Sequence, residues 1–176
     1  MAWVERSLKL CAATALFAAT GCSGSSDPSP AVFSPTGPDG QTLTQTEVSC
    51  TGDPRVDTYS ASMTKPGELG RLSFHFTELE PAPPAKGTNT FHLQIDDANG
   101  ETITGDLGVD LVMPDHGHGT SVTPAVTLDP TTHEYTVTPL YLFMAGVWRI
   151  QFEAFADSQS GAAPLDRATV FFCIEG

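Results

Sequence analysis

The sequence predicts an all-β protein, an antiparallel sandwich of seven or eight short strands. Runs rich in β-branched and aromatic residues recur along its last part, and Pro, Gly, Asn and Asp separate them. No comparable helical period is present. The part that carries these runs is about 130 residues long, the size of one domain. Short strands spaced in this way are typical of two packed sheets.

The predicted strands follow one another without an intervening helix. A first strand is expected around residues 47–51. The others are expected at residues 71–77, 90–95, 109–113, 125–128, 134–143, 147–155 and 168–174. The segment Asp97-Ala98-Asn99-Gly100 predicts a hairpin turn.

Alternation along three of these strands assigns their faces. In the strands at 71–77 and 90–95 the apolar side chains share one face, while His75 and His92 point to the other. The side chains predicted to point into the core are Leu72, Phe74, Phe76, Phe91, Leu93, Ile95, Trp148, Ile150, Phe152 and Ala154. Each of these strands therefore has one buried and one wet face.

The N-terminus has the features of an export signal. Arg6 and Lys9 give a positive start, and the apolar stretch at residues 10–19 is too short to span a bilayer. Its end, Ala19-Thr20-Gly21-Cys22, resembles the lipobox of bacterial lipoproteins, which are cleaved before a cysteine that then carries a lipid. The sequence thus predicts a signal peptide at residues 1–21, a lipid anchor on Cys22 and attachment to a membrane of the cell envelope.

The residue after Cys22 predicts which membrane carries the anchor. Ser23, by resemblance to the sorting pattern of proteobacterial lipoproteins, favours the outer membrane if the host has one, with the domain facing the periplasm. The alternative is an ordinary signal peptide with a cysteine there by chance. Residues 22–40 are rich in Pro, Gly and Ser and predict a disordered tether, so residues 41–176 are the expected folded domain.

The net charge limits the classes of partner that the protein can bind, and the cysteines predict a disulfide. The net charge of −13 argues against nucleic acid and anionic headgroups as partners. With Cys11 in the signal and Cys22 lipidated, Cys50 and Cys173 remain and predict a disulfide that ties the first strand to the last. A two-cysteine metal site is the alternative, but such ligands usually lie closer in sequence.

A methionine and two histidines stand together in Met113-Pro114-Asp115-His116-Gly117-His118-Gly119, and Met144 follows in a second turn. If the two turns meet at one end of the sandwich, Met113, His116, His118 and Met144 form a set of thioether and imidazole ligands. Such ligands favour copper over magnesium or calcium. Zinc is the competing ion, and it would prefer Asp115 to a thioether as third ligand.

The same residues have an interpretation without metal. His116 and His118 could hydrogen-bond backbone groups of a tight turn, while Met113 and Met144 end their strands in the core. The other histidines, His75, His92 and His133, each stand alone and are weaker ligand candidates.

Several segments together resemble YtkA-like domains. They are Lys86-Gly87-Thr88-Asn89-Thr90-Phe91-His92-Leu93, Asp97-Ala98-Asn99-Gly100-Glu101, the Met113 to Gly119 turn, Tyr135, and Leu142-x-Met144-x-Gly146-x-Trp148. The resemblance spans roughly residues 70 to 156. It implies a small immunoglobulin-like exported domain, with relatives associated with copper handling and oxidase maturation. Ala145 departs from the family, which commonly has proline there.

Catalytic motifs are missing from the sequence. There is no nucleophile elbow, zinc-protease motif or phosphate-binding loop, and the Asp97 to Gly100 segment lacks the spacing of a calcium loop. The protein is therefore not expected to be an enzyme. Two hypotheses remain: a lipid-tethered domain for copper handling or delivery, and an immunoglobulin-like module without metal that is structural or docks an envelope protein.

Overall fold

The computed structural model describes residues 49–156 and 163–176, which contain nine strands and no helix. The strands are β1 (Thr64–Pro66), β2 (Leu72–Glu80), β3 (Gly87–Asp97), β4 (Asp106–Met113), β5 (His118–Gly119), β6 (Ala125–Leu128), β7 (Tyr135–Leu142), β8 (Gly146–Phe155) and β9 (Asp166–Ile174). The predicted signal peptide, lipid anchor and tether lie outside the described residues. Within these residues, no helix could cross a membrane.

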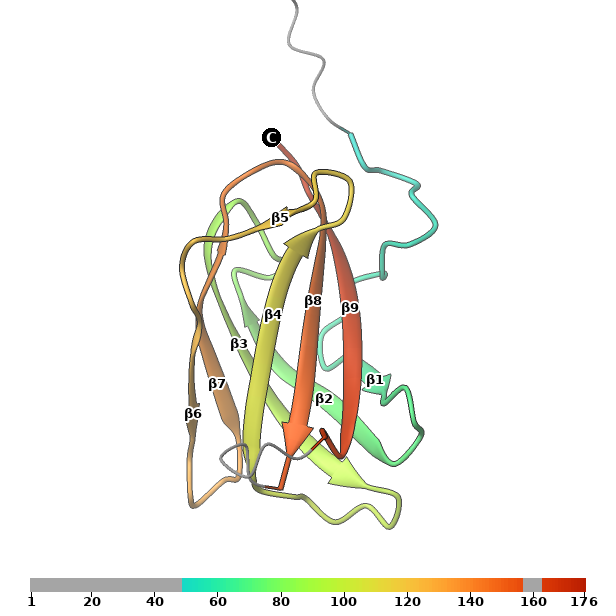
Figure 1. The fold of residues 1–176 in the computed structure, drawn as a ribbon, viewed down its shortest axis with the longest axis vertical. Coiled ribbons are helices and arrows are strands. Elements are labelled where there is room, and N and C mark those ends of the chain that lie inside the picture. Colours follow the sequence, from blue (N-terminus) through green and yellow to red (C-terminus); the bar gives the residue numbers. More distant parts are fainter. Residues whose placement is uncertain (1–48, 157–162) are drawn as a thin grey trace, which may run out of the picture. The chain divides into compact units, whose positions relative to one another are not determined.

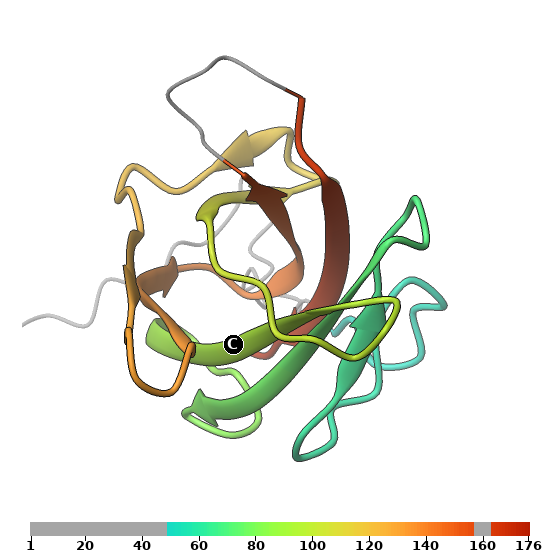
Figure 2. The same ribbon diagram turned by 90° about the horizontal axis from the view of Figure 1, so that it is seen from below.

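The strands form two antiparallel sheets that face each other. One sheet has the order β1-β2-β3-β7-β6 and the other has the order β5-β4-β8-β9. β4, β8 and β9 lie in front of β2 and β3 in Figure 1, and the view along the strands in Figure 2 shows the two curved layers around a common interior. The predicted all-β antiparallel sandwich is confirmed.

The core lies between the two sheets and is rich in aromatic rings. Phe76 of β2 packs edge-on against Phe152 of β8, with ring centroids 5.3 Å apart, and Phe91 of β3 meets Phe172 of β9 at 5.8 Å. All ten side chains predicted to point inward are buried. Burying each large apolar side chain contributes about 1.5–3 kcal/mol, so this alternation is the main source of stability.

The prediction of a strand at residues 47–51 is wrong for residues 49–51, the part of it that the structure describes. Residues 49–51 are not in a strand, and Cys50 opens a run of turns. In these turns the Asp53 amide donates to the Cys50 carbonyl at 3.1 Å, and the Val56 amide donates to the Asp53 carbonyl at 3.1 Å. Thr51-Gly52-Asp53-Pro54 supplies turn residues, which override the apolar pattern before them.

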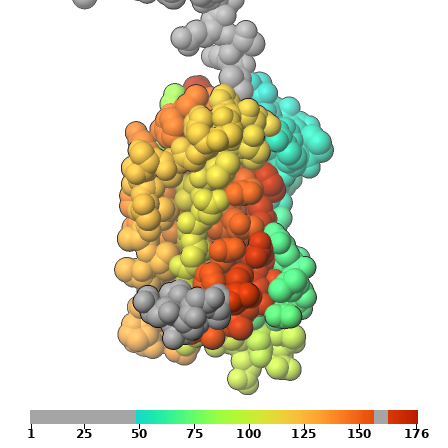
Figure 3. Space-filling model, viewed as in Figure 1, coloured from blue at the N-terminus to red at the C-terminus, as the bar shows by residue number. Residues whose placement is uncertain are grey.

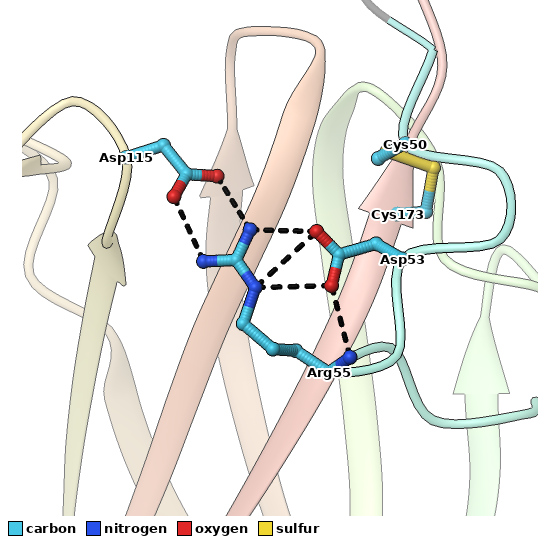
Figure 4. A network of polar contacts seen from close by, with 5 residues as sticks. All are labelled: Cys50, Asp53, Arg55, Asp115 and Cys173. Atoms are coloured by element: carbon cyan, nitrogen blue, oxygen red, sulfur yellow. Dashed lines mark hydrogen bonds and ion pairs between the residues drawn. A yellow bond between two sulfur atoms is a disulfide. The ribbon is translucent and has the colours of Figure 1, made fainter.

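The predicted disulfide is confirmed. Cys50 is bonded to Cys173, with Cα atoms 5.5 Å apart and a sequence separation of 123 residues. Because Cys50 precedes β1 instead of lying in a strand, the bond attaches the turn segment to β9 and does not join two strands. This segment is therefore fixed to the end of the sandwich where β4 also ends (Figure 4).

Candidate metal site

The turn between β4 and β5 carries both candidate histidines. The amides of His116 and Gly117 both donate to the Met113 carbonyl, at 3.1 and 2.9 Å. Gly117 has a φ of +66°, which glycine adopts without a steric penalty and which reverses the chain here. Met113 then pairs with His118 across the hairpin. The short turn thus places His116 near its tip and His118 at the start of β5, both with exposed side chains.

The two imidazole rings lie close enough to bind one ion together. Their centroids are 5.6 Å apart, with an interplanar angle of 64°. Two imidazole nitrogens that each bind a metal at about 2.0 Å place their ring centres roughly 5–6 Å apart. The ring of His118 contacts the Gly119 carbonyl through Nδ1 at 3.3 Å. Within the described ranges, no hydrogen bond reaches the ring of His116.

A second turn, at residues 143–145 between β7 and β8, lies against the histidine turn. The ring of Phe143 stacks on the ring of His118, with centroids 5.8 Å apart and an interplanar angle of 25°. Trp148 donates from Nε1 to the Met144 carbonyl at 2.9 Å, which fixes the backbone of this turn. The structure therefore brings together the two turns that the sequence singled out.

The two methionines differ from the histidines in exposure. Met113 ends β4 and is completely buried, and its Cε lies close to Gly146. Met144 is partly buried and packs against the core. The exposed candidate ligands are therefore the imidazoles, and Met144 on the neighbouring turn is a partly buried candidate. Met113 as a ligand stays a prediction, since its sulfur is enclosed in the core.

Asp115 lies between Met113 and His116 in the sequence, and its side chain points toward Arg55 (Figure 4). Arg55 donates from its two terminal nitrogens to the two oxygens of Asp115, at 2.8 and 2.7 Å. Arg55 also holds Asp53, with its Nε 3.0 Å from Oδ1 and a terminal nitrogen 2.7 Å from Oδ2. Hydrogen bonds from Arg55 lower the pKa of Asp53 to about 2 and hold the pKa of Asp115 below its usual range.

A shallow cavity of about 360 Å³ lies beside His116. Its lining comes from three segments: the turns after Cys50, the histidine turn and the start of β8. In the space-filling view of Figure 3, the yellow segment that contains the histidine turn lies at one end of the domain, close to the cyan residues after Cys50. The His116 side chain is thus reachable from solvent.

The remaining histidines each make polar contacts of their own. His75 contacts Thr64 Oγ1 through Nδ1 at 2.9 Å and Asp96 through Nε2 at 3.2 Å. His92 lies 3.3 Å from Glu134. His133 occupies a turn with a φ of +56°. In the part of the chain that the structure describes, no three His, Cys, Asp or Glu side chains are arranged to hold a metal.

Sequence reasoning missed Arg55 and did not assign Phe143 to the site. Arg55 lies 60 residues before Asp115, and nothing local in the sequence links them. Phe143 is the last residue of a predicted strand, where its ring is expected to be one more apolar side chain. The glycines around the histidines are the only local signal that another group approaches this turn.

The fold and this end of it define a class: an antiparallel β-sandwich with an exposed histidine pair on the turn after one strand. Residues 68–153 match the YtkA-like family, which confirms the resemblance that the sequence predicts. The matched range includes both turns of the candidate site. Arg55 and the disulfide lie outside it.

Two solved structures resemble the chain in fold. One is a copper-bound variant of FetP from uropathogenic Escherichia coli strain F11, with 13% identity and a TM-score of 0.41, over 65% of this chain and 96% of that one. The other is the 'as isolated' form of FetP from the same strain. It has 13% identity and a TM-score of 0.40, over 67% of this chain and 97% of that one. Comparison with curated proteins gives no match.

Proposed function

We propose that this protein is an envelope lipoprotein whose β-sandwich binds a soft metal ion, copper, for handling or delivery. His116 and His118 are the primary ligands, and Met144 supplies a thioether from the neighbouring turn. The observation that carries the proposal is the pair of exposed imidazoles with centroids 5.6 Å apart. The proposal is for binding and not for catalysis.

The donor set supports copper over zinc. Imidazole and thioether ligands suit Cu(I) in low coordination, whereas zinc usually takes a third ligand such as a carboxylate. The nearest carboxylate in sequence, Asp115, has both oxygens engaged by Arg55. When bound, copper would supply a soft centre that can pass to a partner, and the protein's own part is to hold two imidazoles open to solvent.

The location in the envelope is also part of the proposal. The lipobox at residues 19–22 predicts the lipid anchor. The Cys50–Cys173 disulfide supports an oxidising compartment, because structural disulfides persist outside the cytoplasm. A periplasm-facing domain on a lipid anchor, on the outer membrane if the host has one, fits both features.

A titration of the full-length protein with Cu(I) against a competing chelator tests the proposal. We expect one-to-one binding that weakens at least a hundredfold in the double variant His116→Ala/His118→Ala, because two of the ligands are lost. Since both side chains are exposed, its free energy of unfolding should change by less than about 1 kcal/mol.

The matched control is His133→Asn, which removes an exposed turn histidine from a position with positive φ that asparagine tolerates. It should bind copper as the unmodified protein does. Copper binding that is absent, or that the double variant retains, would contradict the assigned site.

A second candidate function is docking of an envelope protein without metal. It is favoured by Tyr141, an exposed aromatic residue whose ring stacks on Phe143 at 6.1 Å. Tyr141→Ala should then weaken capture of the partner in metal-free buffer, whereas under the copper proposal it leaves the affinity for Cu(I) unchanged.

A further inference from the structure

The chain segment Asp115-His116-Gly117-His118 contains the ligand types of a zinc site. Two imidazoles and a carboxylate are a common set of three protein ligands for zinc. In the structure this set is incomplete, because the carboxylate of Asp115 is directed to Arg55 (Figure 4). Arg55 thus occupies the carboxylate that lies next to the histidine pair in the sequence.

Arg55 holds Asp115 in a two-pronged contact. One terminal nitrogen donates to Oδ1 at 2.8 Å and the other donates to Oδ2 at 2.7 Å. A planar guanidinium matches a carboxylate in this way, so both oxygens are occupied at once. A metal ion could bind Asp115 only by replacing at least one of these bonds.

We infer that Arg55 is a specificity-determining positioning residue: it withholds the Asp115 carboxylate from His116 and His118 and so disfavours zinc relative to Cu(I). This inference rests on the proposed function, because it assumes that the histidine pair binds metal. Arg55 itself touches no ion. It acts through Asp115.

The segment that carries Arg55 is attached to β9 on both sides of this residue. Before it, Cys50 is bonded to Cys173. After it, the Asp57 amide donates to the Phe171 carbonyl at 2.9 Å, and the Phe171 amide donates to Asp57 Oδ2 at 2.9 Å. Lys65 adds an ion pair with Asp57 at 2.6 Å. Arg55 is thus held in place by the fold and not only by its contact with Asp115.

Charge acts in the same direction as geometry. Arg55 is paired with two carboxylates, Asp53 and Asp115, at this end of the domain. Without the guanidinium, both carboxylates would be unpaired beside the histidine turn. A divalent cation gains more than a monovalent one from that change, because the Coulomb energy scales with the charge of the ion.

The test compares affinities for Zn²⁺ and Cu(I), each measured by chelator competition on the full-length protein. Arg55→Met leaves an unbranched apolar side chain but removes the guanidinium, and so releases Asp115. We expect its Zn²⁺ affinity to rise about tenfold, with the Cu(I) affinity within twofold of the unmodified protein. Adding Asp115→Asn to Arg55→Met should return the Zn²⁺ affinity to its original value.

Arg167→Met is the matched control, because it removes a surface guanidinium whose own carboxylate contacts are longer, at 3.9 and 3.7 Å. It should leave both affinities unchanged. An unchanged Zn²⁺ affinity in Arg55→Met, or an equal loss for both metals, overturns the inference, since a purely structural role would affect both ions alike.

Failure of the proposed function has a different signature. If the unmodified protein binds no Cu(I) while Arg55→Met gains Zn²⁺ binding that Asp115→Asn removes, the role of Arg55 is supported and copper handling is rejected. If the His116→Ala/His118→Ala variant keeps Cu(I) binding and Arg55→Met shows no gain for zinc, both are rejected.

Discussion

Met113 lies against Gly146, and its terminal methyl group occupies the space that a side chain at residue 146 would need. A Cβ added at Gly146 would lie 2.8 Å from Met113 Cε, a distance at which one of the two must move. Gly146 also has a φ of +130°, which disfavours any residue with a side chain. The start of β8 is therefore matched to the buried end of β4.

Gly146→Ala should lower the free energy of unfolding by about 2–4 kcal/mol, because it combines overpacking with backbone strain. Denaturant unfolding measures this loss. Gly117→Ala is the control, since Gly117 has a φ of +66° but no atom within 4 Å of the added Cβ. It should cost only about 1 kcal/mol. Equal losses in the two variants would show that the contact with Met113 contributes nothing.

Removal of the disulfide should cost more than any single substitution named here. The Cys50–Cys173 bond closes a loop of 123 residues, and the chain-entropy estimate for such a loop is about 4–5 kcal/mol. We expect Cys50→Ser/Cys173→Ser to unfold at a correspondingly lower denaturant concentration. Reductant should shift the unmodified protein to the same midpoint and leave the variant where it is. A reductant effect on the variant would point to another cause.

The sandwich could be predicted because its signals are local. Alternation of apolar and polar residues marked the long strands, and the burial of Phe74 and Phe91 follows from that period. The short strands β1 and β5 were missed, since three residues or two cannot show a period. Residues 49–51 were wrongly predicted to form a strand, because the turn residues Thr51-Gly52-Asp53-Pro54 favour a turn instead.

The candidate site could be predicted only in part. His116 and His118 stand in one short segment, so their nearness to each other is a local property. The contact of Phe143 with His118 depends on how the strands are arranged in the sheets, and that of Arg55 with Asp115 depends on how the segment after Cys50 is attached to β9. The spacing of residues in the sequence does not reveal such contacts unless the order of the strands in the sheets is known.

Tyr135 of β7 is linked through its hydroxyl to Gly105, the residue before β4 in the other sheet. The hydroxyl donates to the Gly105 carbonyl at 3.0 Å and accepts from the Gly105 amide at 2.8 Å. Tyr135→Phe leaves both backbone groups without their partner, and we expect a loss of about 2 kcal/mol in urea unfolding. Tyr141→Phe, which changes an exposed ring, should stay within about 0.5 kcal/mol. Equal stability of the two variants would contradict the assigned role.

Asp166 is a buried carboxylate that the loop before β2 encloses. The amides of Leu69, Arg71 and Leu72 donate to it at 2.8, 2.8 and 3.1 Å, and its neighbour Arg167 donates at 2.8 Å. Desolvation by burial acts to raise its pKa, but these four backbone donors outweigh it and lower the pKa. The charged form is therefore the one that the fold stabilises.

Asp166→Asn should destabilise the protein by about 3 kcal/mol at pH 7, because bonds to a charged acceptor are lost. Since the folded-state pKa is lowered, the contribution of Asp166 is complete above its ordinary pKa of about 3.9 and is lost as the pH falls through the folded-state value. The difference from the unmodified protein should shrink below pH ~4. Unfolding curves at several pH values test this, with Glu101→Gln on an exposed turn as control. A difference that stays constant with pH would contradict it.

The ring of Phe143 stacks on the ring of His118 and should help to orient it for copper. Phe143→Leu keeps an apolar side chain beside Trp148 but removes the flat face that lies 5.8 Å from the His118 ring. Groups that orient a ligand typically affect metal affinity by 10–100-fold, so we expect Cu(I) to bind about tenfold more weakly. Tyr141→Leu removes the outer ring and leaves Phe143 in place, so its Cu(I) affinity should stay within twofold. If Phe143→Leu binds copper as well as Tyr141→Leu does, the stacked ring does not orient His118.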